Sequence, residues 1–97
     1  MNIKIQSVKF NADQKLLAFI EAKLSKLERI SDKITSTEVT LKLDKDVEHG
    51  NKVATITLVV PGDTLVAEHK SKSFEESVDE CTDALKKQLE KYKEKKA

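Results

Sequence analysis

Basic residues gather in two short stretches whose leucines repeat at helical spacing. Residues 23–29 read Lys-Leu-Ser-Lys-Leu-Glu-Arg, and residues 85–93 read Leu-Lys-Lys-Gln-Leu-Glu-Lys-Tyr-Lys. In each stretch the leucines define one apolar helix face, so the basic side chains lie on the outward faces. Cations that share a surface can neutralise several phosphates together, which favours RNA as a partner. The predicted RNA-binding residues are Lys23, Lys26, Arg29, Lys86 and Lys87.

Helix stability offers a simpler explanation for part of this charge pattern. Residues 71–97 contain seven acidic and seven basic residues, with acids gathered at 75–83 and lysines at 86–96. An acidic start and a basic end are what the helix macrodipole favours. A single basic stripe is commonly a solvated face, and the whole chain has a net charge of only +1. The RNA hypothesis therefore depends on both basic stretches lying on one surface.

Residues able to carry out covalent or metal chemistry are few. Gly50 and Gly62 are the only glycines, so the sequence has no glycine-rich phosphate loop. His49 and His69 stand at spacings from Cys81 that form no metal-ligand motif. Cys81 falls on the apolar stripe of a predicted helix, where a small buried side chain is expected rather than a nucleophile. We therefore expect no enzymatic activity, no metal site, no cofactor and no small-molecule substrate.

Length and composition indicate one globular domain, residues 1–97. Of the 97 residues, 38% are hydrophobic and 36% charged, which suffices for a single modest core. No apolar run reaches the roughly 18 residues of a membrane span. The first residues lack the apolar centre of a signal peptide. A single cysteine excludes an internal disulfide and fits a reducing compartment, so we expect a cytoplasmic protein that does not bind membranes.

Hydrophobic periodicity indicates the elements that must position the basic residues. Apolar residues alternate over residues 3–10 with a phase change near Ser7, which predicts a first strand with a bulge. A helix is predicted over residues 13–30. We expect Asn11 to cap this helix and Gln14 to close a capping box.

The second half of the chain is typical of three strands and a helix. Alternating apolar residues predict strands at 38–43, 52–60 and 64–70, separated by turns at His-Gly-Asn (49–51) and Pro-Gly-Asp (61–63). A second capping box, formed by Ser73 and Glu76, predicts the start of the last helix. We expect this helix to fray after Tyr92, so that the lysine-rich tail, residues 93–97, is frayed.

The element order β-α-β-β-β-α predicts an α+β fold. The hairpin-linked strands indicate a four-stranded, antiparallel-rich sheet, and we expect all four strands to be antiparallel. Each helix has an apolar face that needs cover, and one sheet face can supply it, so both helices are predicted on the same face. The residues expected to be largely buried are Leu24, Leu27, Ile30, Val78, Leu85 and Leu89.

This pattern resembles one known protein family. The element order, residues 23–28, the strand Val-Thr-Leu-Lys-Leu at 39–43 and residues 85–93 are similar to the ribosome hibernation-promoting factor family. The family is also called ribosome-associated inhibitor A or, under an older label, sigma factor modulation protein. The resemblance covers nearly the whole chain and implies a double-stranded-RNA-binding-domain-like fold. It also implies binding to the small ribosomal subunit near the decoding centre, where messenger and transfer RNA are blocked under stress.

The resemblance extends unevenly to single residues. Three basic residues of the first helix match basic positions of the family: Lys23, Lys26 and Arg29. Lys87 stands where the family usually has an arginine, which grips phosphate better through its planar fork. This chain also departs from the family by Ala84, where a lysine is usual, and by the added acids Glu75 and Glu76. These departures reduce the positive charge of the second helix.

The sequence therefore predicts a ribosome hibernation factor that inhibits translation, with the small ribosomal subunit and ribosomal RNA as partners. The alternative is a protein–protein adaptor, for example a modulator of a transcription regulator that docks through the acidic start of the second helix. Salt dependence distinguishes the two hypotheses. Affinity that comes from many phosphate contacts falls steeply with salt, whereas a docking site with a hydrophobic centre depends on salt less.

Overall fold

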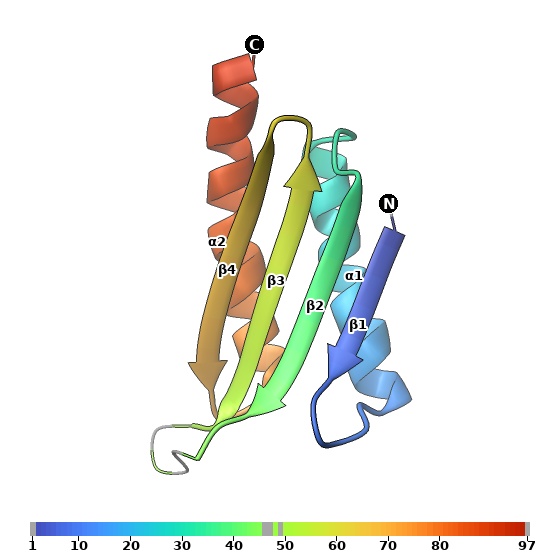
Figure 1. The fold of residues 1–97 in the computed structure, drawn as a ribbon, viewed down its shortest axis with the longest axis vertical. Helices are drawn as coiled ribbons and strands as arrows, with labels where there is room; N and C mark the ends of the chain where they lie inside the picture. Colours follow the sequence, from blue (N-terminus) through green and yellow to red (C-terminus); the bar gives the residue numbers. More distant parts are fainter. Residues whose placement is uncertain (1, 46–47, 49, 97) are drawn as a thin grey trace.

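The computed structural model describes residues 2–45, 48 and 50–96 of the chain (Figure 1). The predicted order of strands and helices is confirmed. The elements are β1 (Asn2–Ser7), α1 (Gln14–Ile30), β2 (Ser36–Leu43), β3 (Lys52–Val60), β4 (Asp63–Ser71) and α2 (Phe74–Lys96). No helix within the described residues is both long and apolar enough to cross a membrane.

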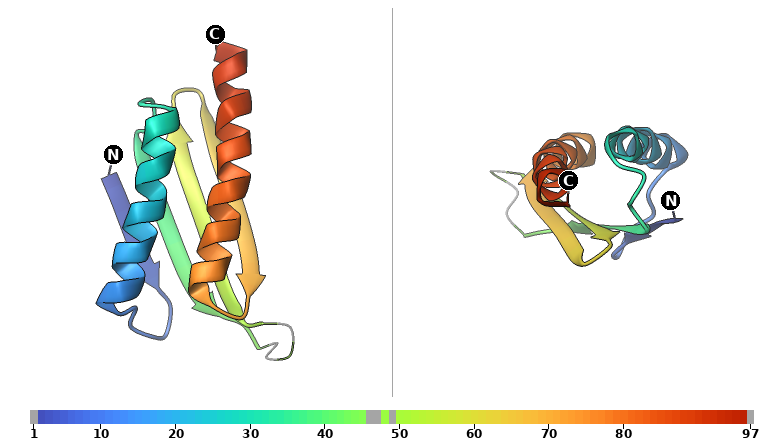
Figure 2. Two further views of the ribbon diagram at one scale, coloured as in Figure 1. Left: turned by 180° about the vertical axis from the view of Figure 1, so that it is seen from behind. Right: turned by 90° about the horizontal axis from the view of Figure 1, so that it is seen from above.

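The four strands form one sheet in the order β1-β2-β3-β4, with both helices on the same face (Figure 2). The pairs β2–β3 and β3–β4 are antiparallel, as expected for hairpin-linked strands. The expectation that all four strands are antiparallel is wrong for β1, which runs parallel to β2 with Ile5 opposite Val39. The physical reason is that α1 carries the chain back along the sheet, so β2 starts at the same end as β1.

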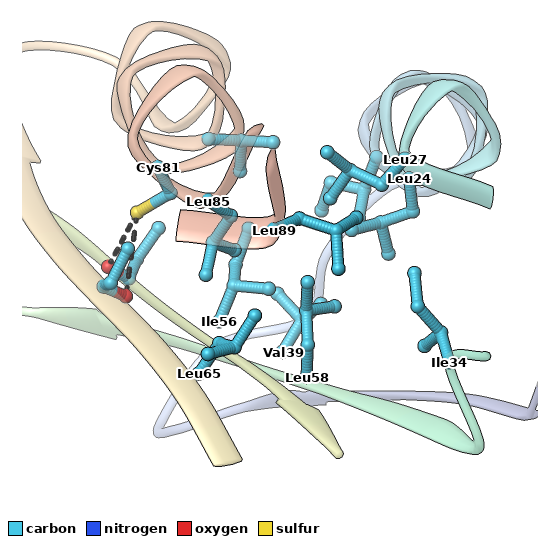
Figure 3. Close-up of a cluster of buried hydrophobic side chains, with 14 of the residues drawn as sticks. Leu24, Leu27, Ile34, Val39, Ile56, Leu58, Leu65, Cys81, Leu85 and Leu89 are labelled. Carbon is cyan, nitrogen blue, oxygen red and sulfur yellow. Dashed lines mark hydrogen bonds between the residues drawn. The ribbon is translucent and has the colours of Figure 1, made fainter. Parts of the chain in front are cut away.

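A single hydrophobic core fills the space between the helix layer and the sheet (Figure 3). Alternate residues of the central strand β3, namely Ala54, Ile56 and Leu58, point toward the helices and are fully buried. Five of the six residues predicted to be buried are so: Leu24, Leu27, Val78, Leu85 and Leu89. Ile30 is only half-buried, because it lines a hollow between the two helices. The apolar side of each predicted helix therefore faces the sheet as expected.

The start of α1 differs from the prediction. The cap is Asp13 rather than Asn11, and its carboxylate accepts a hydrogen bond of 2.8 Å from the backbone N–H of Leu16. The reason lies upstream, where β1 ends at Ser7 and Lys9 takes a left-handed conformation with φ 65°. The chain leaves the sheet there and turns toward the helix two residues later than expected. The second predicted cap is confirmed, since Ser73 Oγ accepts from the N–H of Glu76 at 3.1 Å.

The C-terminal part of α2 is more ordered than the sequence indicates. The helix continues to Lys96 rather than fraying after Tyr92. Tyr92 is buried, and its hydroxyl donates a 2.7 Å hydrogen bond to the carbonyl of Pro61 in the β3–β4 turn. Lys93 Nζ donates a 2.7 Å hydrogen bond to the carbonyl of Ile30, at the end of α1. These two contacts attach the end of α2 to the rest of the fold.

Two turns and one strand edge complete the architecture. The predicted turn at 61–63 is confirmed, because Val60 pairs with Asp63 and Gly62 has φ 80°. The other predicted turn includes His49, which lies outside the described residues. At the outer edge of the sheet, Gln88 of α2 donates a 3.0 Å hydrogen bond to the carbonyl of Val66 in β4.

Candidate nucleic-acid interface

The outward surface of the helix layer carries most of the predicted RNA-binding residues. α1 and α2 lie side by side and run in the same direction, so their C-terminal ends meet at one end of the molecule (Figure 2). Each basic stretch belongs to the C-terminal half of its helix. The parallel arrangement therefore places the two stretches next to each other, which the sequence alone could not establish.

A groove of about 310 Å³ runs between the two helices. We call it the interhelical groove, and its lining residues are Lys23, Lys26, Leu27, Ile30, Thr82, Asp83 and Lys86. Its apolar lining comes from Leu27 and Ile30 of α1, while Lys26 and Lys86 bring positive charge from opposite sides. Three of the five predicted residues thus line one groove. Their shared location meets the condition that the phosphate-binding hypothesis requires.

Lys23 has an internal partner that the sequence did not reveal. Its ammonium forms an ion pair with the carboxylate of Asp79 in α2, with 2.5 Å between Nζ and Oδ1. The same ammonium lies 5.7 Å from the centroid of the Phe19 ring. Lys23 therefore links the two helices as well as lining the groove. Its charge is compensated in the protein by that of Asp79.

Arg29 lines a second hollow, at the C-terminal ends of the helices. This hollow has a volume of about 920 Å³ and is bounded by the end of α1, the Pro61–Gly62 turn and Tyr92. Its basic residues are Arg29, Lys33 and Lys93, and its acidic residues are Glu28 and Asp32. Sequence reasoning did not include Lys33 and Lys93 among the predicted RNA-binding residues. Lys93 could have been found from its place in the second basic stretch, had fraying not been expected there.

Lys87 lines neither the interhelical groove nor the hollow at the helix ends. It follows Lys86 directly, so its side chain is rotated by about 100° around the helix axis. That rotation directs Lys87 to the outer ridge of α2, where it is exposed. Its neighbours one helical turn away include the acids Asp83 and Glu90 and the basic residue Lys91. Lys87 therefore lies outside the groove lining and has neighbours of both charges.

The opposite face of the sheet has a different charge arrangement. Its lysines lie among acidic side chains, such as Lys42, which is 4.0 Å from Glu68. Lys70 lies 3.3 Å from Asp44, and this contact contributes to lowering the pKa of the Asp44 carboxyl, although the main cause is the N–H of Lys45. Positive charge at Lys42 and Lys70 is therefore compensated locally.

Of the three His and Cys residues, the structure describes Cys81 and His69, and both make contacts that link α2 to the sheet. Cys81 is fully buried, as predicted, and its Sγ contacts the carbonyls of Ala54 at 3.3 Å and Ala67 at 3.6 Å (Figure 3). Burial raises the pKa of the Cys81 thiol to about 12. His69 Nδ1 lies 3.2 Å from Glu80 Oε2, which joins β4 to α2. Within the described residues, no group of three or more His, Cys, Asp or Glu side chains could hold a metal ion.

Comparison with known proteins gives a consistent result. A sequence model of the family described as "Sigma 54 modulation protein / S30EA ribosomal protein" matches residues 3–97. The ribosome hibernation promotion factor of Deinococcus radiodurans is 38% identical over 78 residues, which are 77% of this chain but only 40% of that protein. The ribosome hibernation promoting factor of Pseudomonas putida is 33% identical over 95 residues, 98% of this chain and 89% of that protein.

Solved structures have the same fold. A ribosomal subunit interface protein from Coxiella burnetii has a TM-score of 0.82 and 26% identity, covering 96% of this chain and 98% of that one. The N-terminal domain of Thermus thermophilus Protein Y also has a TM-score of 0.82, at 24% identity, covering 95% of this chain and 99% of that one. The predicted fold class and the predicted family are thus confirmed. The chain belongs to the Sigma 54 modulation protein / S30EA ribosomal protein family.

Proposed function

We propose that this protein is a ribosome hibernation factor that binds the ribosome through the basic surface of its helix layer. The names of its relatives in Deinococcus radiodurans and Pseudomonas putida support hibernation as the function. The description of the Coxiella burnetii protein supports the ribosome as the partner. Because ribosomes are the target, the protein acts in the cytoplasm. It represses translation under stress without catalysing a reaction.

The interhelical groove is the observation that carries the proposal. Lys26 and Lys86 bring positive charge to the groove from different helices, and the half-buried Ile30 lies between them as apolar lining. Phosphates of folded RNA are bound by cations held at such fixed positions. The C-terminal hollow, with Arg29, Lys33 and Lys93, extends the same basic surface toward the helix ends. We assign ribosomal RNA of the small subunit as the ligand of this surface.

The aromatic residues favour recognition of phosphates and RNA shape over base stacking. Phe10 stacks on Phe74 with 4.9 Å between ring centroids, and Tyr92 is buried. Phe19 is half-buried and lies beneath the ammonium of Lys23. Proteins that bind unpaired bases offer exposed rings on which the bases stack. Binding here depends instead on backbone phosphates, as in recognition of structured RNA.

The five predicted RNA-binding residues take different parts in this proposal. Lys26, Arg29 and Lys86 contact phosphates directly, and Lys33 and Lys93 join them at the helix ends. Lys87 contributes only general positive charge, and Lys23 contacts RNA only when its ion pair with Asp79 opens. By resemblance to the family, the binding site lies near the decoding centre, where the protein blocks messenger and transfer RNA. The adaptor hypothesis, with docking through Glu75 and Glu76, is not supported by the names of the curated relatives.

A charge-reversal experiment tests the proposal. We expect Lys26→Glu combined with Lys86→Glu to weaken binding to purified bacterial small ribosomal subunits by about 10- to 100-fold at moderate salt, because two phosphate contacts become repulsive. The variant should also fail to inhibit a cell-free translation reaction. Binding is measured by cosedimentation, and thermal unfolding verifies that the fold is retained.

A matched control separates the groove from total charge. Lys4→Glu combined with Lys42→Glu changes the net charge equally but on the opposite face of the sheet, and binding should remain close to wild type. Lys87→Glu should weaken binding less than Lys86→Glu, because Lys87 lies outside the groove. Equal losses in the groove variant and the opposite-face variant would contradict the assignment of the groove as the binding surface.

A further inference from the structure

The ion pair between Lys23 and Asp79 joins the two helices at one end of the interhelical groove. Nζ of Lys23 and Oδ1 of Asp79 are 2.5 Å apart, and the side chains are 25% and 47% exposed. The ring of Phe19 lies 5.7 Å from the same ammonium. Lys23 is thus the most enclosed of the predicted RNA-binding residues, and a carboxylate already occupies a position that a phosphate oxygen would take.

The other two lysines of the groove are in a different situation. Among the residues that the structure describes, Lys26 and Lys86 have no carboxylate within ion-pair distance, and both are exposed. They can meet a phosphate without first releasing an internal partner. Lys23 can do so only by exchanging Asp79 for the phosphate. The groove therefore combines two available cations with one that is held back.

We propose that Asp79 is a specificity-determining residue that competes with RNA phosphates for Lys23. The inference rests on the proposed function, because it concerns the same groove. A ligand with closely spaced phosphates, such as folded ribosomal RNA, presents enough negative charge around Lys23 to displace the carboxylate. An isolated phosphate or a flexible single strand does not displace the Asp79 carboxylate. Such a ligand would only replace one ion pair of Lys23 with another, which gives no net gain. Asp79 thus lowers affinity for every polyanion but lowers it least for densely folded RNA.

Removing the charge of Asp79 tests this competition. Asp79→Asn should bind small ribosomal subunits several-fold more tightly at low salt, because Lys23 then meets a phosphate without the cost of displacing a carboxylate. For a short single-stranded RNA, which does not displace Asp79 in the wild type, Lys23 is one more contact, and affinity should fall about threefold further between about 50 and 200 mM salt. The gain should be larger for a short single-stranded RNA than for small subunits, so discrimination between the two ligands should fall. Both affinities are measured across a salt series.

Two further variants identify the residue through which Asp79 acts. Lys23→Gln should weaken binding more in the Asp79→Asn protein than in the wild type, because there Lys23 meets a phosphate without first giving up an ion pair with Asp79. Asp83→Asn is the matched control, since Asp83 lines the same groove and its removal changes the net charge equally. The gain in affinity from Asp83→Asn should be the same whether residue 23 is lysine or glutamine.

Each outcome decides between competition and a general charge effect. If Asp79→Asn and Asp83→Asn gain affinity alike, and Lys23→Gln has the same effect in every background, the competition proposal is overturned. In that case Asp79 acts only through the overall electrostatic field of the protein. If the wild-type protein itself does not bind small subunits at low salt, the proposed function fails, and this inference fails with it.

Discussion

Cys81 is the residue whose chemistry is most changed by the fold. Its thiol sits between α2 and the strands β3 and β4, where it contacts the carbonyls of Ala54 and Ala67. Loss of water around the sulfur disfavours the thiolate, which raises the pKa from 9.0 to about 12. A thiol in this state is neither a nucleophile nor a metal ligand at neutral pH. The side chain is part of the hydrophobic core.

The raised pKa of Cys81 predicts a loss of stability at alkaline pH. Above pH 9.0 the thiol of the unfolded chain releases its proton, while the folded chain keeps it until about pH 12. The unfolded state then binds fewer protons, so the free energy of unfolding falls as pH rises through this window. The decrease attributable to this one group approaches about 1.4 kcal/mol per pH unit. Urea unfolding at several pH values from 7.5 upward measures it.

Cys81→Ser provides the control for this prediction, because a hydroxyl does not titrate in that range. At pH 7.5 the variant should be less stable than wild type by about 1–3 kcal/mol, since the smaller hydroxyl packs poorly in the same place. That difference should shrink as pH rises above 9.0. A difference that stays constant with pH would mean that the thiol does not remain protonated in the folded protein.

At the scale of elements, the connection between β2 and β3 meets the connection between β4 and α2. Gly50 has φ 100°, and a Cβ atom placed on it would lie 2.4 Å from the carbonyl carbon of Ser71. Beside this contact, Ser77 Oγ donates to the carbonyl of Lys52 at 2.6 Å and lies 2.7 Å from Ser71 Oγ. The start of β3, the end of β4 and the start of α2 are therefore held together at one point.

Substitution of Gly50 should disrupt the close packing of Gly50 against Ser71. Gly50→Ala is expected to lower the free energy of unfolding by about 2–4 kcal/mol, because the added methyl group overlaps the backbone and the left-handed φ disfavours it. Gly62→Ala is the matched comparison, since Gly62 also has a positive φ of 80° but lies in an exposed turn. Its cost should stay near 1–2 kcal/mol, roughly the penalty for the backbone conformation alone. Similar losses in both variants, measured by urea unfolding, would rule out the steric explanation.

The periodicity of apolar residues is sufficient to predict the strands and helices. It does not predict the cap of α1 or the pairing direction of β1, which depend on the path of the chain. The leucines of α1 and α2 face the sheet as their spacing required. The cap of α1 was misplaced because Asn11 and Asp13 both suit that role, and only the bend at Lys9 selects Asp13. The parallel pairing of β1 depends on where α1 ends, which alternation within a strand does not encode.

At the candidate interface, too, the position of a residue on its own helix is predictable from the sequence, whereas its contacts with the other helix are not. Helical spacing places Lys26 on the outward surface of α1, where it lines the groove. The partner of Lys23 is Asp79, separated by 56 residues in sequence, and nothing in either helix alone pairs them. The sequence predicts a frayed tail at Lys93 because its partner, the carbonyl of Ile30, is 63 residues away. Contacts between the two helices are thus what sequence reasoning could not supply.

At the scale of the whole molecule, a near-neutral protein presents one basic surface. The net charge is +1, yet the cations of the interhelical groove and the helix ends gather on one side of the fold. On the opposite face of the sheet, Lys42 and Lys70 have acidic neighbours. Association with RNA should therefore depend on local rather than total charge.

Salt titration of wild-type binding provides the test at this scale. If four or five phosphates are neutralised, the logarithm of the association constant should fall linearly with the logarithm of salt concentration, with a slope of about −3 to −4.5. Binding to purified small ribosomal subunits is measured between low and moderate salt. A slope close to zero would favour docking through a hydrophobic centre and so the adaptor hypothesis.

The contact between Gln88 and the edge of the sheet has a consequence for how copies of this protein behave at high concentration. An edge strand with free main-chain groups is a template on which a neighbouring molecule can add a strand. In β4 one such acceptor, the carbonyl of Val66, is already bonded to a side chain of α2. Glu68 and Lys70 add charge to the same strand, and Pro61 precedes it. β4 is thus a poor seed for aggregation.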